Sequence, residues 1–294
     1  MTPTFTTGAE LLGSWLADVE SGELPVRFQL AEPFTALDVR PGRMILFGGP
    51  PGSGKTAALL QMGIDLLRLN ESARLLVANV EMMPTLLLER IVSRLSAVPL
   101  TAIANRTMTA DERQRVRMAV ASLEPVATRL AFLNPPFTLE NVAAAGTEFK
   151  ANAMILDYIQ RFSVGDGSKD RREQLETGMS VLRRFCDAGA VILVAAAVAR
   201  QNGKSGSNYG NLGLASFRGS SELEYGCDSA YILVPDGSGG IVFQCEKNRF
   251  GAVENVPTAF DATRQTFNPF VELSGLDAFD AATPARANGE SKGG

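Results

Sequence analysis

Residues Gly49 to Thr56 read GPPGSGKT, and this stretch constrains the fold of the 294-residue chain more than any other. It fits the phosphate-loop pattern G-x-x-x-x-G-K-[ST] at every fixed position. An apolar run, RMILFG, precedes the motif, and an apolar-rich segment of helical length, AALLQMGIDLLRL, follows it. Strand, glycine-rich loop and helix are the context in which this motif binds phosphate, so we predict binding of ATP or GTP.

The residue types of the motif predict separate roles. The glycines let the backbone curl so that its N–H groups face phosphate oxygens. Lys55 is expected to reach the outer phosphates, and the Thr56 hydroxyl to bind Mg²⁺, a small hard cation. Asp157 ends the apolar run MILD and is the expected second Mg²⁺ contact. The predicted nucleotide-binding residues are Gly49, Pro50, Pro51, Gly52, Ser53, Gly54, Lys55 and Thr56.

Composition limits the chemistry. With 45% hydrophobic and 20% charged residues, the chain suits one large α/β domain. The absence of histidine excludes Ser-His and Cys-His nucleophile pairs and leaves carboxylates, lysine and arginine for catalysis. Cys186, Cys227 and Cys245 lie far apart in the sequence and are expected to be buried, reduced thiols. We see neither a membrane-spanning run nor a signal peptide, so we expect a cytoplasmic protein without membrane contact.

Strand and helix patterns alternate after the phosphate loop. This alternation favours a mainly parallel sheet with helices on both faces. Glu81 follows the second apolar run, at the sheet edge where ligands bind, and is placed to face a γ-phosphate. The last two expected strands read as an antiparallel hairpin that closes the sheet. The expected strands are 73–81, 130–134, 153–159, 190–197, 229–234 and 240–247, and the expected helices are 85–98, 107–123, 139–150 and 171–187.

Two stretches rich in Gly, Ser and Asn, at 162–172 and 200–218, are expected to be long loops. The second carries Arg200, Lys204 and Arg218 and no acid, although the whole chain has a net charge of −4 and a pI near 5.2. A local basic surplus suits a phosphate backbone, so we predict a confined nucleic-acid contact here. A surface loop without a partner is the alternative.

Three regions are expected along the chain: a linker segment over 1–32, a motor domain over 33–273, and a disordered tail over 274–294. The linker contains an amphipathic helix at Gly8 to Gly22, and a helix of this length is too short to be stable alone. It needs a partner surface, on its own core or on a neighbouring subunit. The apolar residues of this face are Leu11, Leu12, Trp15, Leu16 and Val19.

Five motifs together resemble the RecA-like motor domain of DnaB-family replicative helicases. They are GPPGSGKT, VEMMPTLLLERIVSRLS, MILDYIQRF, SFRGSSELEYGCDSAYIL and EKNRFG, in the family's order and approximate spacing from about Pro33 to about Phe270. The resemblance implies a RecA-like P-loop NTPase fold and a hexameric ring that hydrolyses ATP between subunits. It also implies movement 5′ to 3′ on single-stranded DNA, in DNA replication, with a helicase loader or initiator protein as a further partner. In that family a linker helix packs on the adjacent subunit, and the same docking is implied for Gly8 to Gly22.

The resemblance also implies residue roles. Glu81 matches the glutamate that activates the attacking water, and Asp157 matches the Mg²⁺ residue. Arg249 matches an arginine finger that reaches the neighbour's nucleotide, with Lys247 as its companion. Gln160 falls where the family keeps a glutamine. The residues that match the family's DNA-gripping loop are Arg218, Gly219 and Ser221.

Two departures from the family pattern keep a second function open. The family's primase-recruiting N-terminal domain has no counterpart in this sequence. Ala196 and Ala197 stand where the family has a serine and a glutamine that sense the γ-phosphate, with Gln201 further along. The leading hypothesis is an ATP-driven helicase or translocase. The alternative is a RecA-like ATPase that works as a switch or loader and unwinds no duplex.

Overall fold

The computed structural model describes residues 5–163, 171–198, 201–203, 206–208, 212–217, 220–236 and 240–270. Its helices are α1 Gly8–Ser21, α2 Lys55–Leu69, α3 Pro84–Ser96, α4 Leu100–Ala104, α5 Ala110–Ala127, α6 Leu139–Phe149, α7 Arg171–Asp187 and α8 Ser220–Gly226, with short 3-10 turns η1 Ile159–Arg161 and η2 Leu214–Ser216. Its strands are β1 Met44–Gly48, β2 Leu75–Asn79, β3 Leu130–Phe132, β4 Ala153–Asp157, β5 Val191–Ala195, β6 Gln201–Gly203, β7 Gly206–Asn208, β8 Ser229–Pro235, β9 Gly240–Asn248, β10 Val256–Asp261 and β11 Thr266–Pro269.

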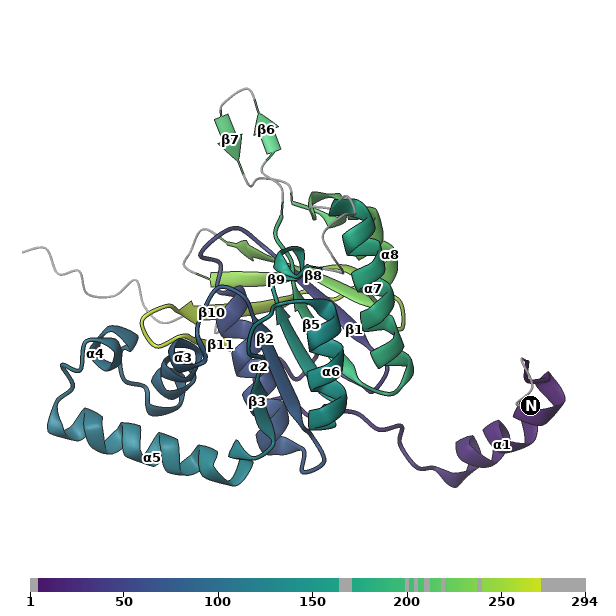
Figure 1. The fold of residues 1–294 in the computed structure, drawn as a ribbon, viewed down its shortest axis with the longest axis horizontal. Coiled ribbons are helices and arrows are strands. Elements are labelled where there is room, and N and C mark those ends of the chain that lie inside the picture. The colour runs from purple at the N-terminus through teal and green to yellow at the C-terminus, as the bar shows by residue number, and fades with distance from the viewer. Residues whose placement is uncertain are drawn as a thin grey trace, which may run out of the picture.

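A mixed sheet forms the centre of the molecule (Figure 1). Within the described residues its strand order is β11-β10-β9-β8-β1-β5-β4-β2-β3. The strands from β8 through β3 in this order run parallel, and β9, β10 and β11 are antiparallel. All carboxyl ends of the parallel strands therefore lie at one edge, where a nucleotide loop after β1 is expected to work.

Helices cover both faces of this sheet, because the strand residues alternate between two apolar cores. In β1, Ile45 and Phe47 join the core beneath α2, α3 and α5, whereas Met44 and Leu46 join the core beneath α6, α7 and α8. β4 and β5 alternate in the same way. Strands that are apolar on both faces read as continuous hydrophobic runs, and this confirms the predicted α/β fold with helices on both faces.

The prediction that the sheet closes at its hairpin was wrong. β8 and β9 do form the predicted antiparallel pair, but β10 and β11 extend the sheet beyond them. Pro257 lies in β10 and Pro269 in β11, and proline argues against a strand when only the sequence is read. In the fold, Pro257 lies before the part of β10 that pairs with β11, which begins at Thr258. Its missing N–H therefore costs the ladder with β11 no hydrogen bond, although Pro257 is level with Val242 in the ladder with β9.

The last strand is bonded to the helix that follows the phosphate loop. The Gln61 side chain of α2 donates to the Phe267 carbonyl at 2.9 Å and accepts from the Phe267 N–H at 2.8 Å. Gln61 is only 2% exposed, so both hydrogen bonds are shielded from water. The Phe267 ring stacks on Phe260 at 4.4 Å. The final hairpin is thus part of the core under the loop.

Two segments project from this body (Figure 1). α1 lies apart from it, and none of its residues is buried. Part of the segment predicted as a long loop at 200–218 instead forms the hairpin of β6 and β7, followed by η2. The expected tail at 274–294 lies outside the described residues.

Cys186, Cys227 and Cys245 are free and buried, as predicted. Among the helices in the described ranges, none combines the length and apolarity needed to cross a bilayer.

Candidate functional site

The phosphate loop lies between β1 and α2, at the carboxyl edge of the parallel strands. Gly54 caps α2 with φ +85°, a conformation that favours glycine. A Cβ at this position would also lie 2.8 Å from the ring of Phe267. Glycine at 54 is therefore required twice, by the backbone turn and by the aromatic ring packed beneath it.

Lys55 points into the loop that carries it. Its ammonium donates to the carbonyls of Gly49 and Pro50, both at 2.8 Å. Burial lowers the pKa of Lys55, and the nearby carboxylates of Asp157 and Glu81 oppose that shift. The ammonium thus lies in the concavity that phosphate oxygens occupy in proteins with this motif.

Thr56 and Asp157 meet beside the lysine. The Thr56 hydroxyl donates to Asp157 Oδ2 at 2.5 Å, and the Asn79 amide donates to the same oxygen at 2.9 Å. Burial raises the pKa of Asp157, and the hydrogen bond from Thr56 is the largest opposing effect. A hydroxyl and a carboxylate in contact at a phosphate loop are hard oxygen ligands of the kind that Mg²⁺ takes, so these residues fit that ion.

Glu81 lies two residues beyond β2, held there by Asn79. The Asn79 side-chain oxygen accepts from the N–H groups of Glu81 and Met82 at 2.9 and 2.8 Å. Asn79 pairs with Asp157 across neighbouring strands, so one amide side chain orients both carboxylate residues. Asn79 was not predicted from the sequence, although a polar residue that ends a buried apolar run is a usable signal.

Glu81 also has a basic neighbour. Its carboxylate lies 3.9 Å from the guanidinium of Arg161, in η1, and both side chains are about half exposed, at 48% and 53%. Arg161 was not singled out in the sequence.

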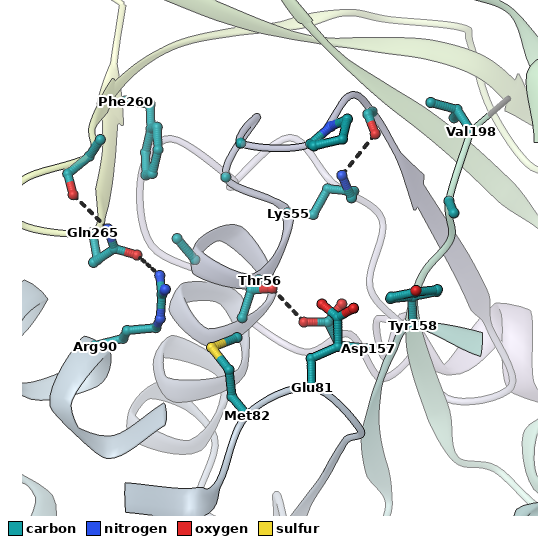
Figure 2. A pocket seen from close by; sticks show the side chains of 17 residues that line it. Lys55, Thr56, Glu81, Met82, Arg90, Asp157, Tyr158, Val198, Phe260 and Gln265 are labelled. Atoms are coloured by element: carbon teal, nitrogen blue, oxygen red, sulfur yellow. Dashed lines mark hydrogen bonds between the residues drawn. The ribbon is translucent and has the colours of Figure 1, made fainter. Parts of the chain in front are cut away.

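These groups open onto a cavity of about 860 Å³ (Figure 2). Its walls come from distant parts of the chain: the phosphate loop, Arg90 of α3, the ends of β2, β4 and β5, and the turn between β10 and β11. Arg90 donates to the Gln265 side chain, which joins α3 to that turn. Arg90, Phe260 and Gln265 were not predicted as site residues, because only the fold brings them to the cavity.

The two alanines after β5 have different surroundings. Ala196 is buried in the core beneath α7, whereas Ala197 lines the cavity. The Gln160 side chain accepts from the Ala197 N–H at 3.0 Å and donates to the Ala197 carbonyl at 3.3 Å. Gln160 therefore holds the backbone at Ala197, just after β5. Gln201 opens β6.

Arg249 and Lys247 lie at the opposite edge of the sheet. Asn248, between them, pairs with Ser229 at the start of β8, and Ser229 is level with Ile45 near the start of β1. The phosphate loop begins at the other end of β1, a strand of five residues, roughly 16 Å long. Neither cation lines the cavity of its own chain.

Both cations contact the junction between α8 and β8. The Lys247 ammonium donates to the carbonyls of Glu224 and Cys227, at the end of α8. The Arg249 guanidinium lies 3.1 Å from the Asp228 carboxylate.

Of the predicted DNA-binding residues, the structure describes only Ser221. Arg200, Lys204, Arg218 and Gly219 lie outside the described residues. Ser221 is in the first turn of α8, which places it just after the segment that carries Arg218.

A phosphate loop at the carboxyl edge of a mainly parallel sheet, with helices on both faces, defines a P-loop nucleotide-binding protein with a RecA-like core. The model of the DnaB-like helicase C terminal domain family matches residues 34–269. The chain belongs to that family.

Solved structures agree on the fold. A structure of a single ATPase domain matches with a TM-score of 0.78 at 17% identity, over 91% of this chain and 100% of that one. A DnaB-like replicative helicase, solved together with its interactions with primase, matches with a TM-score of 0.76 at 17% identity, over 91% of this chain and 68% of that one. None of the curated proteins matches in sequence.

Proposed function

We propose that this chain is an ATP-driven DNA helicase or translocase that assembles into a ring, hexameric as in the family it resembles. It would hydrolyse ATP at subunit interfaces and move 5′ to 3′ along single-stranded DNA during replication. The observation that carries this proposal is the position of Arg249, one strand length away from the nucleotide cavity of its own chain. An arginine finger at that edge can serve only a neighbouring subunit.

The residues around the cavity suit phosphoryl transfer. Lys55 would bind the outer phosphates, and Glu81 would orient and deprotonate the attacking water. Thr56 and Asp157 would hold Mg²⁺, which when bound neutralises charge on the phosphate oxygens. Asn79 would keep Glu81 and Asp157 apart and aligned, because its amide bonds the Asp157 carboxylate and the Glu81 N–H at once.

In an assembly, Arg249 would donate to the transferred phosphoryl group of the adjacent subunit. Such a finger is worth about 10³ to 10⁵ in rate, so hydrolysis would depend on assembly. Lys247 would support it from β9, the strand that ends just before Arg249, by fixing the end of α8.

Single-stranded DNA would contact the segment that holds Arg200, Lys204, Arg218, Gly219 and Ser221. The net charge of −4 supports a DNA contact that is confined to this basic segment. A loader or initiator protein would be needed to place a closed ring on DNA.

A switch or loader ATPase is the second candidate, because Ala197 gives the cavity no polar sensor side chain at the end of β5. In that case nucleotide would control assembly and partner binding. Duplex unwinding separates the two candidates.

The experiment compares ATPase rates with and without single-stranded DNA, on protein of known mass in solution, together with unwinding of a duplex that carries a 5′ tail. We expect stimulation by DNA and unwinding. Lys55→Ala should lose most nucleotide binding. Glu81→Gln should still bind ATP but hydrolyse it at least about 100-fold more slowly, because only the base is lost.

Glu71→Gln, an exposed change in the turn after α2, is the matched control and should keep the wild-type rate. If Glu81→Gln hydrolyses ATP at the wild-type rate, Glu81 is not the catalytic base. Hydrolysis without unwinding would favour the switch or loader.

A further inference from the structure

Asp228 is a fully buried carboxylate at the junction of α8 and β8. Its exposure is 0%, yet it has three charged or polar partners. Oδ1 lies 3.1 Å from Arg249 Nη1, and Oδ2 lies 2.8 Å from Arg183 Nη1. Oδ2 also accepts from the Met44 N–H at 3.0 Å. A carboxylate out of water needs such partners, and the two oxygens divide them between different elements.

Arg249 is held to Asp228 by both its main chain and its side chain. Its N–H donates to the Asp228 carbonyl at 2.9 Å, and its guanidinium donates to Oδ1 and, at 3.4 Å, to the Tyr225 carbonyl. The side chain is still 45% exposed. A guanidinium has five N–H donors, and the contacts in the described residues occupy only part of them. Arg249 is therefore fixed in direction while retaining donors for a phosphate outside the chain.

Arg183 already neutralises the charge of Asp228, so the ion pair with Arg249 is not needed for that purpose and can serve to orient Arg249. An arginine finger that is free to rotate must be ordered each time it meets a phosphate, and ordering it in advance favours the transition state. Oδ2 accepts from the N–H of Met44, the first residue of β1. The Asp228 carboxylate therefore also links Arg249 to the central sheet of its own subunit, through the strand that leads to the phosphate loop.

We propose that Asp228 is a positioning residue that holds the Arg249 guanidinium ready to donate to the nucleotide of the adjacent subunit. This rests on the proposed function, in which Arg249 acts in trans. Asp228 itself touches no nucleotide: its effect on hydrolysis passes through Arg249.

The test uses Asp228→Asn in the full chain. We expect at least a tenfold loss of ATPase activity, with nucleotide affinity within twofold of wild type. Co-assembly with Lys55→Ala should restore activity. Each Asp228→Asn subunit keeps a good nucleotide site, and each Lys55→Ala subunit keeps a well-positioned Arg249. In a randomly mixed head-to-tail ring about a quarter of the junctions combine the two intact halves.

This rescue would not follow from a merely structural defect, because a damaged Asp228→Asn subunit would not hydrolyse ATP beside any neighbour. Asp187→Asn is the matched control: Asp187 is the other carboxylate paired with Arg183, at 3.2 Å, and is 63% exposed. It should retain full activity. If Asp228→Asn does not fold, Arg183→Met combined with Asp228→Asn takes its place, because that pair removes the repulsion between two uncompensated arginines.

Arg249→Ala is tested in parallel with Lys55→Ala. Rescue of Arg249→Ala without rescue of Asp228→Asn would overturn the role of Asp228 and leave the trans finger standing. Full activity of Arg249→Ala alone would overturn the finger itself, and the role of Asp228 with it. Unchanged activity of Asp228→Asn while Arg249→Ala is inactive would also overturn the positioning role.

Discussion

Arg161 and Glu81 form an ion pair beside the nucleotide cavity, with 3.9 Å between guanidinium and carboxylate. In the proposed mechanism Glu81 must hold water, so the pair competes with that task. Exposed ion pairs are worth at most about 1 kcal/mol, which limits the competition to roughly fivefold in rate. Arg161 therefore restrains the candidate base mildly.

Replacing Arg161 by alanine should raise the ATPase rate measured without DNA by about two- to fivefold, because Glu81 is released. Steady-state hydrolysis measures this directly. Arg117→Ala is the control, since that arginine bonds only Gln114 within α5 among the described contacts. A lower rate in Arg161→Ala would mean that Arg161 assists hydrolysis and would contradict the restraint.

The sequence predicts those site residues that belong to a short, contiguous motif. Lys55, Thr56 and Asp157 belong to contiguous motifs, and the fold brings all three to the cavity, where Thr56 bonds Asp157. Arg90 and Gln265 join the cavity from segments 175 residues apart, so no local pattern connects them.

Among the elements, α1 is the least connected to the rest of the chain. A capping box at Thr7 and Glu10 starts it, and Gly22 ends it in a left-handed conformation. Its apolar face is nevertheless exposed, with Trp15 at 60% and Leu12 at 65%. The helix is locally well specified and needs a surface that its own domain does not supply in the described residues.

Deleting Met1 to Gly22 should shift the protein from rings to monomers or small oligomers and leave the motor domain folded. Burial of each large apolar side chain on a neighbour stabilises a junction by on the order of 2 kcal/mol before ordering costs. Light scattering gives the mass, and thermal unfolding reports the domain. The double change Ala17→Ser and Ser21→Ala, on the side of the helix away from these apolar residues, should keep the ring. A full-size ring formed by the truncated protein would end this idea.

The elements that the sequence predicts well are those buried on both sides. β1, β4 and β5 are continuous apolar runs, and each is buried along its whole length. β10 and β11 contain prolines and are partly exposed, so their apolar pattern is weak. Their strand conformation depends on pairing with the rest of the sheet, which the sequence does not display. The β6–β7 hairpin is built from Gln, Asn, Gly and Ser, which carry no apolar alternation.

For the whole molecule, net charge sets how DNA can be bound. A chain with a net charge of −4 repels a polyanion except where cations gather. The basic segment at 200–218 is the candidate, and it follows β5 at the carboxyl edge of the sheet.

Replacing Arg200, Lys204 and Arg218 with alanine should weaken single-strand binding, reduce its salt dependence by up to about one unit per lost phosphate contact, and preserve basal hydrolysis. Titrations at several salt concentrations measure this. A control with the same loss of charge replaces three exposed cations elsewhere, Arg113, Arg117 and Lys150. If both triple variants bind DNA equally, the contact lies elsewhere.

The hydrogen bonds between Gln61 and Phe267 also bear on how the protein is made. A ribosome releases the phosphate loop about two hundred residues before the strand that Gln61 requires, so the nascent chain exposes the loop without the wall formed by Phe260 and Gln265. The cavity is therefore complete only when nearly the whole domain has left the exit tunnel. A chain interrupted before Phe260 would carry the motif and still lack this wall of the cavity.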